Sequence, residues 1–139
     1  MRRIMQAIGV LAATAGPAVA ATEWGQDTVR GLASYALAAE GGSAVLVCDP
    51  DRVFGETSNA SLAVAMPEDA DATLVVLLAA TGEQAALPLA EGRAAEKDVD
   101  PAEWRQMVEI VRTGGSFAFV TGEDAMRPGD VAPLPGLDC

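Results

Sequence analysis

Apolar residues in this chain fall into short runs separated by glycine, proline and acidic residues. The runs at residues 30–40 and 43–48 flank Gly41 and Gly42, a two-residue connection typical of a β-hairpin. Four further runs predict strands, at residues 61–66, 72–80, 84–89 and 116–120. The 72–80 run, ATLVVLLAA, has Val and Leu on both faces, which predicts the central and most buried strand. Pro88 favours an edge position for the 84–89 strand, because proline cannot donate a ladder hydrogen bond.

One stretch has helical periodicity with both end signals. Asp100 can cap a helix whose first turn contains Pro101 and Glu103, and Gly114 can end it in a left-handed conformation. Between these ends an apolar stripe recurs at helical spacing: Trp104, Met107, Val108 and Val111. The pattern predicts a helix over residues 101–113.

The order of these elements predicts an α+β fold that is predominantly antiparallel β. Several strands precede the single helix and one strand follows it, unlike the alternating strand and helix rhythm of parallel sheets. We expect a sheet or a compact sandwich, with the helix on one face or across an open end. Residues 122–139 contain three prolines and three glycines and are expected to form an extended tail.

The first 20 residues predict a cleaved signal peptide. Arg2 and Arg3 precede an apolar stretch, Gly16-Pro17 interrupts it, and Ala18-Val19-Ala20 supplies the small residues of a cleavage site. A membrane anchor is the alternative, but the stretch is shorter than the roughly 20 residues a spanning helix needs. We therefore expect a single β-rich domain over residues 21–139, located in the periplasm or secreted, with no membrane span after cleavage.

The predicted export bears on the state of the two cysteines, Cys48 and Cys139. An oxidising compartment and an even cysteine count favour a disulfide, and two cysteines allow one intramolecular pairing. Two buried free thiols are the alternative. A bridge closing such a long loop stabilises a fold by about 4–5 kcal/mol on the chain-entropy model, so it would pin the tail to the strand that contains Cys48.

Charge narrows the classes of partner. Without Arg2 and Arg3, seven basic residues stand against twenty acidic ones, a net charge of −13. Nucleic-acid binding depends on Lys and Arg neutralising phosphates, and anionic membrane surfaces repel such a chain, so we expect neither partner. The surplus serves solubility or a cationic partner.

Catalytic and metal motifs are weak. The chain has no histidine, which removes His-dependent nucleophilic mechanisms and the commonest transition-metal ligand. Gly114-Gly115-Ser116 follows a helix, whereas phosphate cradles precede one. Two acidic groups could bind a hard cation, although each fits an ordinary turn better: Asp49, Asp51 and Glu56, and the denser Glu68, Asp69 and Asp71. We expect no catalytic residue, metal or cofactor.

Trp24 and Trp104 are the candidate binding residues. Tryptophan is more often part of a core, but an exposed tryptophan would mark a binding surface.

The whole plan resembles small exported proteobacterial domains. Its features are the signal segment, the early Trp24, the LVC strand ending at Cys48, the WRQMVEIVRTGGSFAF unit at residues 104–119 and the terminal Cys139. Such a plan is similar to that of the invasion-associated locus B type and of the periplasmic proteins that accompany type VI secretion. The resemblance implies a disulfide-closed β-sandwich without catalytic residues. The invasion-associated group commonly has extra cysteines that are missing here.

These observations predict a non-catalytic exported domain that binds a protein or another envelope component. The alternative is a carboxylate-dependent hydrolase acting on an envelope glycan, which would need two acidic side chains about 5–10 Å apart across a cleft. A calcium-stabilised domain is a third, lesser possibility.

Overall fold

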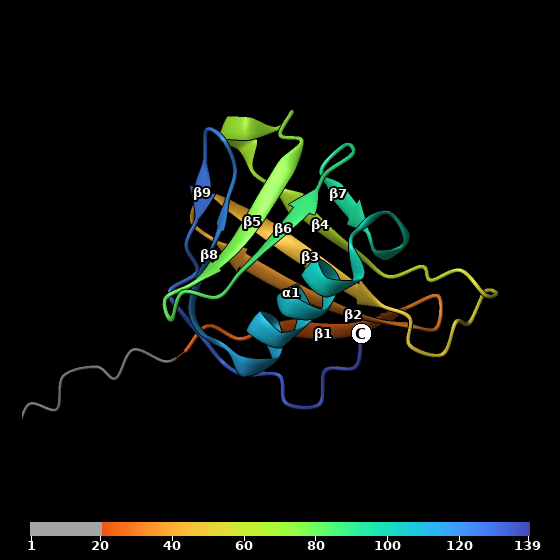
Figure 1. Cartoon of the computed structure of the whole chain (residues 1–139). Coiled ribbons are helices and arrows are strands. Elements are labelled where there is room, and N and C mark those ends of the chain that lie inside the picture. The colour runs from red at the N-terminus through yellow and green to blue at the C-terminus, as the bar shows by residue number, and fades with distance from the viewer. Residues whose placement is uncertain (1–20) are drawn as a thin grey trace, which may run out of the picture.

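The computed structural model of the chain describes residues 21–139, and the predicted signal peptide lies outside these residues. The first sheet has the strand order β1–β2–β3–β4–β7 (Figure 1). Its strands are β1 (Gly25–Val29), β2 (Leu32–Ala39), β3 (Gly42–Cys48), β4 (Ser61–Ala65) and β7 (Arg93–Ala95).

The second sheet has the order β10–β8–β5–β6, and β9 pairs with β8 on the same edge as β10. Its strands are β5 (Leu74–Ala79), β6 (Gln84–Pro88), β8 (Gly115–Val120), β9 (Ala125–Met126) and β10 (Asp130–Val131). The pairings within both sheets are antiparallel. Short 3₁₀ helices η1 (Pro67–Asp69) and η2 (Glu96–Asp98) lie in the connections. The predicted antiparallel α+β class is confirmed.

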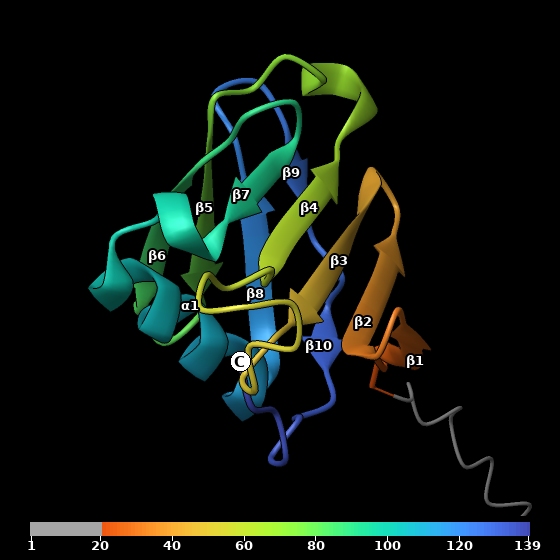
Figure 2. The same ribbon diagram turned by 90° about the vertical axis from the view of Figure 1, so that its right-hand side faces the viewer.

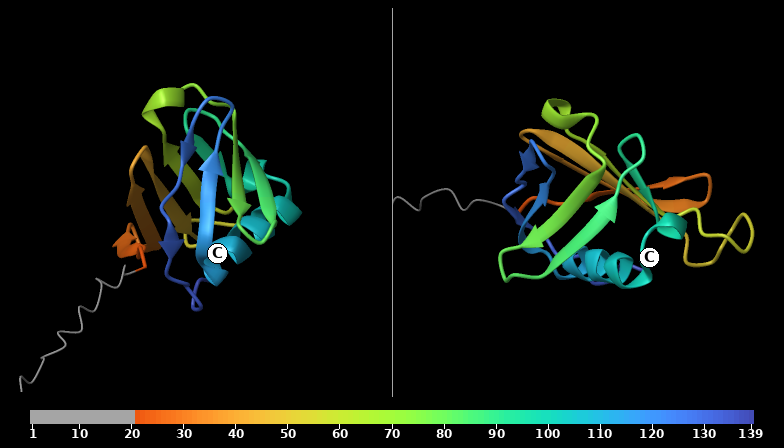
Figure 3. Two further views of the ribbon diagram at one scale, coloured as in Figure 1. Left: turned by 90° about the vertical axis from the view of Figure 1, so that its left-hand side faces the viewer. Right: turned by 45° about the horizontal axis from the view of Figure 1, so that its top comes forward.

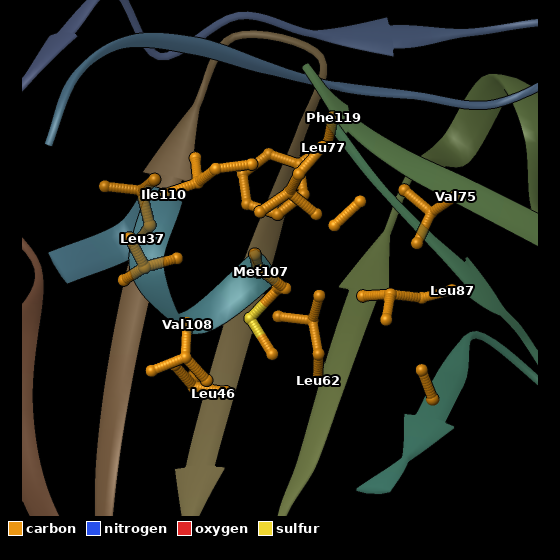
Figure 4. Packing of buried hydrophobic residues seen from close by; sticks show 14 of the residues in the cluster. Leu37, Leu46, Leu62, Val75, Leu77, Leu87, Met107, Val108, Ile110 and Phe119 are labelled. Atoms are coloured by element: carbon orange, nitrogen blue, oxygen red, sulfur yellow. The ribbon is translucent and has the colours of Figure 1, made fainter. Parts of the chain in front are cut away.

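The two sheets pack face to face around one apolar core (Figure 2). Alternate strand residues point inward, so Leu46 and Leu62 of the first sheet meet Leu77 and Phe119 of the second (Figure 4). These four side chains are fully buried. Met107 of the helix extends into the same cluster, which makes the helix part of the core rather than an outer cover.

Helix α1 (Pro101–Thr113) has the predicted bounds and closes one side of the sandwich beside β6 (Figure 3). The Asp100 carboxylate accepts the N–H of Ala102 at 2.8 Å, as an N-cap does. Glu103 does not bond back to its own cap: its Oε2 atom accepts the N–H of Ala86 at 2.9 Å. Since β6 is an edge strand, as Pro88 predicted, Glu103 satisfies a donor that the sheet leaves unpaired. Within residues 21–139, no helix is long and apolar enough to cross a membrane.

The predicted disulfide is confirmed. Cys48 and Cys139 are bonded, with their Cα atoms 4.6 Å apart and 91 positions separating them in the sequence. Helix α1 also holds the end of the chain: the Trp104 indole donates to the Cys139 carbonyl at 3.3 Å, and the Arg112 guanidinium donates to the Leu137 carbonyl at 2.8 and 3.2 Å.

The predicted tail is pinned by the disulfide, but residues 122–139 also contribute β9 and β10 to the second sheet, which the sequence did not predict. Thr22 also joins this segment: its N–H donates to the Asp130 carbonyl at 2.8 Å, and its carbonyl accepts from Ala132 at 2.7 Å. Gly114 adopts φ +69°, and a Cβ atom there would lie 2.7 Å from the Val131 carbonyl oxygen. This glycine therefore ends the helix and also lets the returning chain approach.

Two local predictions in the first sheet are corrected. The hairpin turn is Glu40-Gly41, and Gly42 belongs to β3, where a Cβ atom would lie 2.4 Å from the Ala65 carbonyl oxygen. The close approach of β4 thus requires a glycine inside the strand. The predicted 30–40 strand begins later, because Arg30 and Gly31 form a turn with positive φ and the preceding residues form β1, whose GQDTV sequence lacks an apolar alternation.

Loss of the disulfide is expected to lower the free energy of unfolding by about 4–5 kcal/mol, because reduction restores the entropy of a long open loop to the unfolded chain. Urea unfolding of the mature protein with and without reductant measures this loss. The Cys48→Ser/Cys139→Ser variant should match the reduced wild type. Rapid alkylation of the unreduced, folded protein by iodoacetamide would contradict the assigned bond.

Candidate functional site

The two tryptophans lie in the core and offer no binding surface. Trp24 is 5% exposed and Trp104 is 3% exposed. Trp104 lies on the buried apolar face of α1, and its indole N–H donates a hydrogen bond to the carbonyl of Cys139 at the chain end. The indole N–H of Trp24 is buried without a hydrogen-bond partner. The two indole rings therefore do not form an exposed binding surface.

The Asp49 group forms the anchor of a loop. Asp49 is fully buried, and its two carboxylate oxygens accept the N–H groups of Val53 and Asn59, both at 2.9 Å, and the Asn59 side-chain amide at 3.3 Å. These donors, with Asn59 N–H the strongest, lower the pKa of Asp49 below its ordinary 3.8, although burial acts in the opposite direction. The carboxylate is thus occupied by protein donors, while Asp51 and Glu56 are exposed on the loop.

The second acidic group lies at one end of the sandwich. Glu68 and Asp69 belong to η1, and Asp71 follows it. Asp69 Oδ2 accepts the N–H of Glu123 at 3.1 Å, which ties η1 to the β8–β9 turn. In residues 21–139 no group of three or more Asp, Glu, Cys or His side chains is close enough to hold a metal ion.

The outer face of the second sheet is apolar and uncovered by the described residues. The register places Leu74, Val76 and Leu78 of β5 on this face with Ala118 and Val120 of β8. Leu74 is 47% exposed and Leu78 is 43% exposed, although β5 is an inner strand of its sheet. We call these five residues the β5–β8 face; β5 and β8 lie side by side toward the viewer in the left view of Figure 3.

Two hollows lie along the β5–β8 face. One, of about 500 Å³, is lined by Leu74, Val76 and Val120 together with the acidic residues Asp69, Asp71 and Glu123. The other, of about 560 Å³, is lined by Leu78, Ala118 and Ser116, and Arg127 stands at its margin. The small side chains of Ala118 and Ser116 leave room beside the leucines. The face therefore has an apolar floor with an acidic end.

The 72–80 strand, β5, is an inner strand as predicted, but it is not the most buried one. Val75 and Leu77 are fully buried, but their neighbours Leu74 and Leu78 point outward. The signal was present in the sequence as the unbroken apolar run, which also fits a strand with one exposed apolar face. Only the position of α1, at the side of the sandwich and not over β5, leaves this face open.

The glycine pair after α1 and the Thr81–Glu83 contact are explained by local structure. Gly114 has a positive φ and ends α1, as the sequence predicted, and Gly115, also with positive φ, begins β8. The Thr81 hydroxyl donates to Glu83 and lowers the pKa of that carboxyl, within the turn between β5 and β6. Neither feature forms a cradle for a ligand.

Comparison with protein-family models, with curated proteins and with solved structures finds no match for this chain. The resemblance to the invasion-associated locus B type and to type VI secretion-associated periplasmic proteins stays a prediction.

The Asp49→Asn variant is expected to lower the melting temperature at neutral pH and to lose this effect in acid. A carboxylate with a lowered pKa stabilises the fold at pH values above about 4, and this contribution disappears as the pH falls through the folded-state pKa. Circular-dichroism melting of wild type and variant from pH 7 to pH 2 measures the difference. Asp51→Asn, on the same loop but exposed, is the control. A difference that stays constant down to pH 2 would contradict the assignment.

Proposed function

We propose that this chain is an exported, non-catalytic domain that binds another protein through the β5–β8 face. The observation that supports this proposal is the exposure of Leu74 and Leu78, 47% and 43%, in the middle of a sheet. Exposed apolar patches of this kind, bordered by polar residues, are typical of protein interaction sites. The disulfide and the predicted signal peptide support export to an oxidising compartment.

Charge specifies the partner further. Asp69, Asp71 and Glu123 border one end of the face, and the net charge of residues 21–139 is −13. A segment with apolar side chains followed by Lys or Arg would bury the leucines and meet these carboxylates. A second copy of this chain is disfavoured, because two strongly acidic molecules repel each other.

Photo-crosslinking tests the face in cells that make this chain. With p-benzoylphenylalanine at position 78, ultraviolet light should crosslink the full chain to one protein, whereas the same residue at position 40, exposed in the β2–β3 turn, should not. The captured protein is then purified, and its affinity for wild type and variants is measured by calorimetry. Leu78→Ser should weaken binding about tenfold or more, since it removes buried apolar contact.

Three outcomes would contradict this assignment. They are equal crosslinking from positions 40 and 78, crosslinking only to a second copy, and an unchanged affinity of Leu78→Ser. Wild-type melting behaviour of the variant confirms that any loss arises at the surface.

A carboxylate-dependent hydrolase remains the alternative, and one observation favours it: Asp69, Asp71 and Glu123 line the same hollow of about 500 Å³. A glycosidase needs such a pair of carboxyl groups across a cleft. If this alternative holds, the mature protein releases reducing ends from purified peptidoglycan, and Asp71→Asn or Glu123→Gln abolishes the release. Glu40→Gln is the control, and turnover that persists in both variants removes the alternative.

A further inference from the structure

A second exposed apolar feature lies on the connection between β3 and β4. Residues 49–60, which we call the 49–60 loop, project from the end of the first sheet, away from β5 and β8 (Figures 1 and 3). At its tip Val53 is 52% exposed and Phe54 is 60% exposed. Two adjacent large apolar side chains contribute nothing to the core from this position, so their contribution to folding is small.

The buried Asp49 carboxylate fixes the base of this loop. One oxygen accepts the backbone N–H of Val53, one of the two apolar residues at the tip, and the other accepts the N–H of Asn59, near the end of the loop. Both arms of the loop thus converge on a single side chain that is fully buried. Asp49 directly follows Cys48, so the anchor is adjacent to the disulfide.

A second carboxylate orients the tip. Glu96 of η2 accepts the Ser58 hydroxyl and pairs with the Arg52 guanidinium at 3.5 Å. Arg52 also donates to the Asp49 carbonyl at 2.6 Å. Arg52 and Gly55, on either side of the apolar pair, have positive φ values of +51° and +131°. The hydrogen bonds to Asp49 and the contacts with Glu96 therefore anchor the loop on both sides of its apolar pair, and an anchored segment loses less entropy on binding than a free one.

We propose that the tip of the 49–60 loop is a second docking element, whose Phe54 ring inserts into an apolar pocket of a partner protein. An aromatic ring at a rigid tip offers a large contact area with few rotatable bonds. Asp51 and Glu56 flank the tip at exposed positions, whereas the charge of Arg52 is paired with Glu96. The rim of the partner's pocket therefore carries Lys or Arg. This inference goes beyond the proposed function, because it uses a different surface from the β5–β8 face.

Two other occupants fit the charges less well. A lipid bilayer could accept Val53 and Phe54, but anionic lipids repel the flanking Asp51 and Glu56 and the chain's net charge. A second copy of the chain would bring two identical acidic tips together. A protein pocket with a basic rim satisfies both the apolar pair and its acidic neighbours.

The test places p-benzoylphenylalanine at position 54 of the full chain, in cells that make it, in parallel with positions 78 and 40. Position 54 is expected to crosslink to a protein other than the chain itself, and position 40 is not. After purification of that protein, Phe54→Ala should weaken its affinity for the chain about tenfold or more, and Phe54→Tyr should retain most of it. Both variants should melt like wild type, because the side chain is exposed.

The outcomes separate this inference from the proposed function. Crosslinking from position 78 but not from position 54 overturns the docking loop and leaves the β5–β8 face in place, and the reverse pattern does the opposite. Crosslinking from position 54 to lipid or to another copy overturns the inference, as does an unchanged affinity of Phe54→Ala. Co-sedimentation of the mature protein with phosphatidylcholine vesicles, lost in Phe54→Ala, also overturns it in favour of a membrane.

Discussion

The fold depends on how its last residues return to the first sheet. After β8, the chain pairs along one edge of the second sheet through β9 and β10, passes the C-terminal end of α1, and ends in a disulfide with Cys48 of β3. The disulfide therefore ties the chain end, which follows the second sheet, to β3 of the first sheet. Arg112 and Trp104 of α1 hold the same segment by hydrogen bonds to the carbonyls of Leu137 and Cys139, which brings helix, sheets and chain end into one unit.

This closure lies beside one of the two surfaces that we propose bind partners. Cys48 ends β3, and Asp49 begins the loop whose tip presents Phe54, so the covalent tie and the loop anchor occupy consecutive positions. On the other layer, α1 fills the side of the sandwich and leaves the outer face of β5 and β8 open. The β5–β8 face and the tip of the 49–60 loop thus both lie on anchored elements, and acidic residues lie beside both surfaces. Such surfaces select partners by charge as well as by shape.

Elements with local signals were predictable. Asp100, Pro101 and Gly114 specified both ends of α1, because capping depends on residues within one turn of each end. Strands β2 to β6 and β8 were located, with bounds shifted by a few residues, from their apolar runs. Strands β1, β7, β9 and β10 were not located. β7, β9 and β10 have only two or three residues each, and the GQDTV sequence of β1 has no apolar alternation, so each of the four forms because a neighbouring strand pairs with it.

By itself the sequence determined the class of the fold, helix α1, the disulfide and the acidic surface, since each depends on local periodicity, capping or counts of residue types. Only the tertiary structure decided which apolar residues are exposed. Trp24 and Trp104 are buried while Leu74, Leu78 and Phe54 are not, and hydrophobicity alone does not distinguish them. The physical reason is that burial depends on what packs against a residue. Helix α1 packs against the side of the core between the sheets, whereas among the described residues nothing covers the outer side of β5.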